Sequence, residues 1–215
     1  ALVAGWSMAG CQSYQWAAQY PDMVKAILPF CASSKTSIHN YVFLEGVKAA
    51  LTADKNWNNG NYKKQPIIGL KAFGRVYAGW AFSQKFYREK LYMKLGYKNS
   101  DELLNDWAED HAKNWDANNL LSKLKTWQLN DISTGPIYKN NYIKALKSIR
   151  AKTILMPCNQ DLYFRTEDNM YENKFISRSS LRTIDSPYGH CSANPGNDKN
   201  FELELDKNIK ELLDS

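Results

Sequence analysis

Cysteine and histidine are scarce in this sequence, with four cysteines and three histidines among 215 residues. No two cysteines form a Cys-x-x-Cys pair, so the spacing is not that of a zinc site and we predict no metal. The wide spacing favours free, mostly buried thiols over disulfides. Free thiols are typical of a reducing compartment, and we therefore expect a cytoplasmic location. The cysteines are Cys11, Cys31, Cys158 and Cys191.

Long apolar runs and concentrated charge are also missing. No run approaches the roughly 18 apolar residues of a membrane-spanning helix, so we expect no membrane span. The net charge of +6 is spread as single lysines, and the densest basic spots, 63–64 and 144–152, are short. Binding to nucleic acid or to a membrane surface would favour a concentrated basic stripe. We therefore predict neither partner.

The first 30 residues carry the pattern of a parallel α/β sheet. Residues 1–4 are small and apolar and read as the end of a buried strand, and residues 8–20 read as a helix closed by Tyr20-Pro21-Asp22. A second apolar strand follows at 24–30. Strand, turn, helix and strand in this order begin a parallel sheet with helices on its faces.

The middle of the chain has a different composition, rich in Trp, Tyr, Asn and Lys. Helical periodicity occurs in several pieces: one at 44–54, a longer one at 69–95, and at least one more within 101–124. The sheet pattern then resumes with strands at 152–157 and 180–184 and an amphipathic closing helix at 201–213. We therefore predict a core formed by 1–34 and 147–215 and a helical insertion at 35–146. A separate helical domain is the alternative.

The stretch GWSMAG at residues 5–10 lies where the first strand turns into the first helix. A serine on such a sharp turn projects above the sheet edge, and the residues around it must be small to avoid a collision of strand and helix. Gly5, Ala9 and Gly10 supply that smallness. The helix N-terminus would offer the Met8 N–H to a developing oxyanion, which makes Ser7 a candidate nucleophile. The alternative is a tight turn around an ordinary surface serine.

A nucleophilic serine needs a histidine base and an acid that orients it, in the chain order Ser, Asp, His on this type of fold. We expect His39 in a polar loop and His111 on a solvated helix. His190 follows the last predicted strand, and Asp161 follows the strand that ends at Met156. Both fall at the carboxyl edge of the sheet, so we predict a triad of Ser7, Asp161 and His190. An Asx turn at Asp161 and a turn-capping histidine at His190 are the structural alternatives.

With these motifs, the sequence resembles the α/β-hydrolase superfamily and, more narrowly, its homoserine O-acetyltransferase-like branch. The matching segments are GWSMAG at 5–10 with Gln12, Trp16-Ala17, Tyr20-Pro21-Asp22, ADKNW at 53–57, GNY at 60–62, GLKAFGR at 69–75, DLYF at 161–164 and Gly189-His190. The resemblance implies an α/β-hydrolase fold with a mostly parallel sheet and a helical lid insertion. It also implies a homodimer, because relatives often pair through the insertion.

The resemblance further implies that several strands precede the turn at Ser7 and supply a second oxyanion donor. The sequence here begins at the strand that leads into the Ser7 turn, so we expect an N-terminally truncated core in which only the Met8 N–H faces the oxyanion. Removing one such donor typically lowers the rate by about 100- to 1,000-fold. Missing strands would also expose a sheet edge.

Two positions bear on the substrate. In homoserine acetyltransferases an aspartate directly after the catalytic histidine is thought to hold the substrate ammonium, and here that position is Cys191. The family arginine thought to bind the substrate carboxylate is matched by Arg75, for which a surface arginine is the alternative. The resemblance therefore implies the catalytic machinery but not the specificity for homoserine.

Three functions remain open. The first is transfer of an acyl group, with acetyl as the expected group, from acyl-CoA to an alcohol. The second is hydrolysis of a carboxylic ester by the same triad, and the third is a non-catalytic interaction protein. No cofactor is expected beyond acyl-CoA as a co-substrate. The aromatic residues of the insertion would form a lid that excludes water, or would pack the insertion's own core: Tyr77, Trp80, Phe82, Phe86, Tyr87, Trp107, Trp115 and Trp127.

Overall fold

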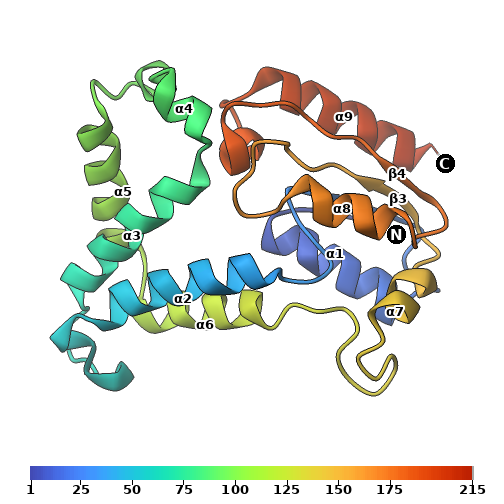
Figure 1. Cartoon of the computed structure of the whole chain (residues 1–215), viewed down its shortest axis with the longest axis horizontal. Helices are drawn as coiled ribbons and strands as arrows, with labels where there is room; N and C mark the ends of the chain where they lie inside the picture. The colour runs from blue at the N-terminus through green and yellow to red at the C-terminus, as the bar shows by residue number, and fades with distance from the viewer. Residues whose placement is uncertain (215) are drawn as a thin grey trace. The chain divides into compact units, whose positions relative to one another are not determined.

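A computed structural model describes residues 1–214, which divide into two compact units (Figure 1). The sheet unit contains residues 1–36 and the chain from Asn130 onward, and the helical unit contains residues 37–129. The chain thus leaves the sheet unit once and returns to it. Each unit is described separately below.

The sheet unit is built on four parallel strands whose order in space follows their order in the chain. They are β1 (Leu2–Trp6), β2 (Ala26–Phe30), β3 (Lys152–Leu155) and β4 (Ser179–Leu181). The predicted strands are confirmed, although β4 ends before Ile184, which forms only an isolated bridge to Cys158. Among residues 1–214, β1 pairs with β2 alone. The predicted fold class, a mostly parallel α/β sheet, is confirmed.

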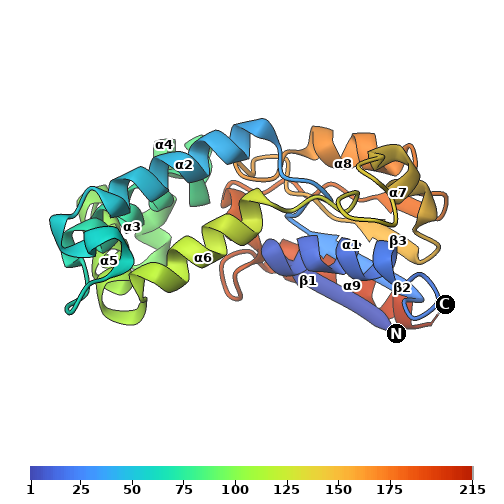
Figure 2. The same ribbon diagram turned by 90° about the horizontal axis from the view of Figure 1, so that it is seen from below.

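Helices cover both faces of this sheet (Figure 2). Alternate strand residues point to opposite faces, so Ile27 packs in a core cluster with helix α1 while Leu28 packs in a second cluster with helix α9. Both strand residues are fully buried. The helical elements of this unit are α1 (Met8–Gln19), α7 (Tyr142–Ser148), α8 (Thr166–Asn173), the 3-10 turn η3 (Gly189–Ala193) and α9 (Lys199–Leu213).

The boundary of the insertion differs from the prediction. Residues 130–146 were expected in the insertion, but they belong to the sheet unit. Ile132 and Leu146 are fully buried in the cluster that includes α1. In addition, the Tyr138 hydroxyl donates to the Ala18 carbonyl of α1. These apolar side chains gain most by burial against the sheet, and that packing sets the boundary near residue 129.

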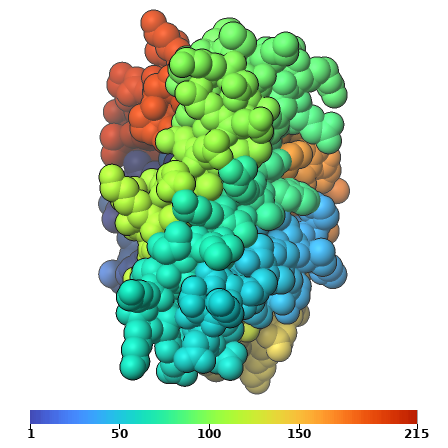
Figure 3. Space-filling model, turned by 90° about the vertical axis from the view of Figure 1, so that its left-hand side faces the viewer, coloured from blue at the N-terminus to red at the C-terminus, as the bar shows by residue number. Residues whose placement is uncertain are grey.

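The helical unit consists of five helices and two 3-10 turns within residues 37–129. They are α2 (Ile38–Thr52), η1 (Lys55–Gly60), α3 (Ile67–Ala81), α4 (Gln84–Arg88), η2 (Leu91–Leu95), α5 (Ser100–Asn114) and α6 (Ala117–Gln128). Figure 3 shows one face of this unit, coloured from light blue to yellow-green. Helices α2 and α6 lie side by side in both ribbon views.

The long helix predicted over 69–95 is wrong. Phe82 is extended, with φ −109° and ψ 154°, so α3 stops there. The Ser83 side chain then accepts a hydrogen bond from Phe86 N at 3.0 Å and starts α4. In the same way, the Asp116 carboxylate accepts from Asn119 N at 2.9 Å and separates α5 from α6. Capping side chains thus divide segments whose apolar periodicity looked continuous.

Histidines outside the sheet unit differ from their predicted settings. His111 lies on α5 as expected, but it is buried, and its Nδ1–H donates to the Trp107 carbonyl at 2.7 Å. Burial lowers the pKa of His111, and the neutral ring packs among aromatic side chains. His39 is exposed at the start of α2 rather than in a loop.

Several aromatic side chains of the insertion pack within the helical unit itself. Phe82 and Phe86 are buried and stack with their ring centroids 4.0 Å apart, and Trp127 is also buried. A cavity of about 320 Å³ in this unit is lined by Tyr77, Asp106, Trp107, Asp110, His111 and Trp115. These contacts fit the core-packing alternative for the buried rings, while a lid function stays a prediction.

All four cysteines are free and buried, which confirms the prediction of unpaired thiols. Burial raises the pKa of the Cys11 thiol to about 12 and that of Cys158 to about 11. Both therefore carry their proton at neutral pH. In residues 1–214, no helix combines the length and the apolar character needed to cross a membrane.

Helices α3 and α5 approach closely at Gly74, and this contact can be tested. A Cβ at Gly74 would lie 2.5 Å from the Trp107 carbonyl oxygen, whereas a Cβ at Gly79 on the same helix would meet nothing within 4 Å. We expect Gly74→Ala to lower the free energy of unfolding by about 1–3 kcal/mol. Gly79→Ala should raise it by up to about 1 kcal/mol, because alanine favours the helix. Urea unfolding followed by circular dichroism measures both, and equal midpoints would contradict the close approach.

Candidate active site

Ser7 occupies the turn between β1 and α1 in a strained backbone conformation. Its φ is 58° and its ψ is −126°, a left-handed region that costs a non-glycine residue about 1–3 kcal/mol. The Ser7 N–H donates to the Phe30 carbonyl at 3.1 Å, and the Ser7 carbonyl accepts from Cys11 N at 3.0 Å. The backbone is thus held on both sides while the side chain remains half-buried.

The small residues around Ser7 are required by this turn. A Cβ on Gly5 would lie 2.4 Å from the Ala9 carbonyl carbon, and a Cβ on Gly10 would lie 2.4 Å from the Ala32 Cβ. Non-bonded carbon atoms do not approach each other this closely, so a side chain at either position would collide with its neighbour. Only glycine at both positions allows strand and helix to leave the turn in these directions.

The side chains of Ser7, His190 and Asp161 form a continuous line of hydrogen bonds. His190 Nε2 lies 3.0 Å from Ser7 Oγ, and His190 Nδ1 lies 2.7 Å from Asp161 Oδ2. Ser7 follows β1, Asp161 follows β3, and His190 lies in η3 beyond β4. The structure therefore brings together all three residues of the predicted triad at the carboxyl edge of the sheet.

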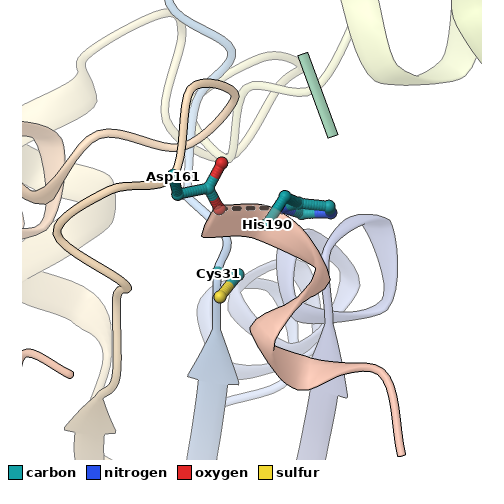
Figure 4. A group of neighbouring side chains, drawn as sticks. All are labelled: Cys31, Asp161 and His190. Carbon is teal, nitrogen blue, oxygen red and sulfur yellow. Dashed lines mark hydrogen bonds and ion pairs between the residues drawn. The ribbon is translucent and has the colours of Figure 1, made fainter. Parts of the chain in front are cut away.

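Asp161 is oriented by its own backbone neighbours. Its carboxylate is fully buried, and Oδ1 accepts hydrogen bonds from Tyr163 N at 2.7 Å and from Phe164 N at 3.2 Å. These donors leave Oδ2 for the imidazole of His190 (Figure 4). Since a carboxylate only accepts, the network assigns the proton to His190 Nδ1 and leaves Nε2 to accept the Ser7 hydroxyl proton.

Aromatic rings surround the imidazole of His190. The ring centroids of Trp6, Tyr163 and Phe164 lie 5.3, 4.6 and 5.6 Å from that of His190. No sequence pattern marks these rings as neighbours of the histidine, although all three lie in the motifs around Ser7 and Asp161. Their packing shields the His190–Asp161 hydrogen bond from water, and a low dielectric strengthens such a bond.

Cys31 lies beside the triad and was not predicted there. Its thiol, one Asp161 oxygen and one His190 nitrogen fall within 4.8 Å of one another, which is a spacing compatible with metal ligands. Burial raises the pKa of Cys31 well above its ordinary value, and the charge of Asp161 raises it further. A metal ion needs a thiolate and free ligand atoms, but this thiol is protonated and Asp161 is already bonded to His190. The cluster therefore fits a metal ion poorly.

The predicted oxyanion donor lies at the start of α1. Met8 is the first residue of that helix, and within residues 1–214 its N–H has no acceptor. The first N–H groups of a helix point outward along its axis and carry a partial positive charge. Met8 N–H is therefore free to bind an oxygen that becomes negatively charged on a substrate carbonyl.

Arg75 and Cys191 are the two residues that the resemblance connects with a substrate. Arg75 is exposed on α3 of the helical unit, where its guanidinium donates to the Asn105 side chain. This pairing fits the surface-arginine alternative, and a role in substrate binding stays a prediction. Cys191 is buried in η3, and burial together with the charge of Asp161 raises the pKa of its thiol to about 12. A neutral thiol offers an ammonium group little.

Comparisons with known proteins give named relatives, although no protein-family model matches the chain. An ethyl acetate hydrolase from Pseudomonas veronii is 32% identical and covers 100% of this chain and 61% of that protein. A homoserine O-acetyltransferase from Trichormus variabilis is 28% identical and covers 88% of this chain and 53% of that protein. The crystal structure of an acetylester hydrolase from Corynebacterium glutamicum superimposes with a TM-score of 0.93 at 29% identity, covering 100% of this chain and 61% of that one. The chain thus spans less than two thirds of the length of these relatives.

Asp161→Asn tests the hydrogen-bond line. The amide would donate to His190 Nδ1, so Nε2 would carry the proton and could no longer accept one from Ser7. We expect kcat for ester cleavage to fall about 10,000-fold with little change in the melting temperature. Asp185→Asn, an exposed carboxylate on the loop before His190, is the control and should retain full activity. Equal activity of both variants would exclude Asp161 as the orienting acid.

Proposed function

The chain belongs to the α/β-hydrolase superfamily, and we propose that it hydrolyses carboxylic esters through a covalent acyl-enzyme on Ser7. The observation that carries the proposal is the hydrogen-bond line from Ser7 Oγ through His190 to the buried Asp161. Serine hydroxyls are weak nucleophiles unless an adjacent base removes their proton. A non-catalytic protein would have no need of a serine, a histidine and an aspartate hydrogen-bonded in this order, so the arrangement argues against the non-catalytic alternative.

The chemistry follows from the positions of the protons. Ser7 Oγ attacks the ester carbonyl carbon as His190 Nε2 takes the hydroxyl proton, and Asp161 stabilises the imidazolium. The Met8 N–H binds the oxyanion of the tetrahedral intermediate. The carbon–oxygen bond to the alcohol then breaks, and His190 gives its proton to the departing alcohol. Water attacks the acyl-enzyme by the same steps and releases the carboxylic acid with Ser7 restored.

Cys191 favours water over an amino-acid acceptor. Its protonated, buried thiol occupies the position where the resemblance predicts an aspartate that holds the substrate ammonium. Without that charge, homoserine has no counter-ion at this point. The names of the ethyl acetate hydrolase and the acetylester hydrolase favour a small acyl group such as acetyl.

Acyl transfer from acyl-CoA to an alcohol is the second candidate. It is supported by the similarity to a homoserine O-acetyltransferase over 88% of the chain. Both reactions pass through the same acyl-enzyme and differ only in the acceptor. A lid that excludes water would favour the alcohol, and pairing of two copies through the helical unit stays a prediction.

The test follows product formation by the purified intact protein with p-nitrophenyl acetate, ethyl acetate, and acetyl-CoA with or without L-homoserine. We expect cleavage of both esters and no homoserine-dependent release of CoA. Ser7→Ala should lower kcat/KM by about 10,000-fold or more and abolish labelling by a fluorophosphonate. Ser122→Ala, at an exposed serine on α6, should change neither.

Two results would overturn the hydrolase proposal. CoA release that rises with homoserine, without ester cleavage, would establish acyl transfer instead. Undiminished labelling of Ser7→Ala would remove Ser7 as the nucleophile and with it both candidate reactions.

A further inference from the structure

A buried carboxylate lies in the sheet unit apart from the triad. Glu172 of α8 is 1% exposed. Its Oε1 accepts hydrogen bonds from Ser34 N at 2.7 Å and Ser34 Oγ at 2.8 Å, and its Oε2 accepts from Tyr14 OH at 2.6 Å and Asn169 Nδ2 at 2.7 Å. No ion pair to Glu172 exists within residues 1–214. Hydrogen-bond donors alone hold this carboxylate.

Each carboxylate oxygen of Glu172 faces at least one group that can only donate a hydrogen bond. The Ser34 N–H can only donate, and the Asn169 amide is fixed as a donor because its Nδ2 also donates to the Ala32 carbonyl at 2.9 Å. Burial raises the pKa of Glu172, and the surrounding hydrogen bonds oppose that effect. A glutamine at this position would direct an N–H group against one of these donors. An unsatisfied buried donor costs about 1–3 kcal/mol.

The network is anchored to the segment of residues 30–34, which begins at the last residue of β2. This segment also contacts the nucleophile turn: the Phe30 carbonyl accepts the Ser7 N–H, and Ala32 lies against Gly10. Between them, Cys31 lies beside Asp161 and His190. One short segment therefore contacts both the nucleophile turn and the acid–base pair.

The segment is itself strained. Cys31 has φ 45° and Ser7 has φ 58°, so two non-glycine residues in neighbouring turns adopt left-handed conformations. Such residues persist only where the surrounding structure fixes them. The Cys31 N–H donates to the Met156 carbonyl at 3.1 Å, which fixes one end of the segment. The bonds of Glu172 to Ser34, and of Asn169 to Ala32, fix the other end.

We propose that Glu172 is a positioning residue: by holding residues 30–34, it fixes the backbone of Ser7 and the contact of Cys31 with the Asp161–His190 pair. The proposal rests on the proposed acyl-enzyme function for its kinetic consequence. Glu172 touches neither substrate nor any reacting atom. Its carboxylate acts through Ser34 and through Asn169, whose side chain it orients toward Ala32.

The experiment compares three variants of the intact protein: Glu172→Gln, Ser34→Ala and Tyr138→Phe. Ser34→Ala removes one donor to Glu172 without introducing a wrong one, so it keeps the test open if Glu172→Gln does not fold. Tyr138→Phe removes a buried hydroxyl that bonds Ala18 and Ser148, away from residues 30–34. It controls for a general loss of stability in the same unit.

Three quantities are measured: kcat and KM for p-nitrophenyl acetate, the rate of Ser7 labelling by a fluorophosphonate, and the rate of Cys31 alkylation by peptide mapping. For Glu172→Gln we expect kcat and labelling to fall about 10- to 100-fold with KM within about twofold, since small displacements of a nucleophile are costly. Ser34→Ala should show a smaller fall of about 3- to 10-fold. Cys31 alkylation should accelerate at least about tenfold in Glu172→Gln, and Tyr138→Phe should match the wild type in all three quantities.

The outcomes separate this inference from the proposed function. Wild-type kcat and alkylation rates in Glu172→Gln, or in Ser34→Ala if the former does not fold, would overturn the positioning role. An equal fall in Tyr138→Phe would also overturn it, because general destabilisation would then explain the effect. If the wild type cleaves no ester, the proposed function fails, and the alkylation of Cys31 alone decides whether Glu172 holds the segment.

Discussion

The left-handed turn at Ser7 is the constraint on which the rest of the site depends. A serine with φ 58° exists only because Gly5 and Gly10 remove the side chains that would collide there. The same turn points the hydroxyl away from the strand and begins α1 directly behind it, with an unpaired N–H at Met8. The strained turn thus presents a candidate nucleophile at Ser7 and a candidate oxyanion donor at Met8, and the surrounding structure must supply the energy that holds it.

Parallel strand topology explains how distant residues meet at this turn. Ser7 and His190 are 183 positions apart in the chain, yet their side chains lie 3.0 Å apart because loops after parallel strands gather at one edge of the sheet. Asp161 joins them from the loop after β3. Burial of its charge is offset by two backbone N–H groups and the imidazole, so the carboxylate is both desolvated and fully bonded.

The named relatives of the chain include both ester hydrolases and homoserine O-acetyltransferases. Ester hydrolases and homoserine acetyltransferases both resemble the chain over most of its length. The hydrogen bonds from Ser7 through His190 to Asp161 cannot distinguish the two proposed reactions, since both would use the same activated serine. In the proposed hydrolase, Cys191 beside the histidine would discriminate between the acceptors, because its protonated thiol offers an amino-acid ammonium no charge.

The sequence alone determined the strands, the nucleophile turn and the three triad residues. These depend on local patterns: apolar runs, small residues at fixed positions around Ser7, and polar residues directly after strands. Tertiary structure alone decided the division of the helical segments, the boundary near residue 129, and the places of Cys31 and Glu172 beside and behind the site. No local signal marks these features, because they depend on which buried faces and hydrogen-bond donors meet after the chain has folded. A glutamate in a short helix looks like surface in a sequence, and only the hydrogen-bond donors packed around Glu172 make it part of the core.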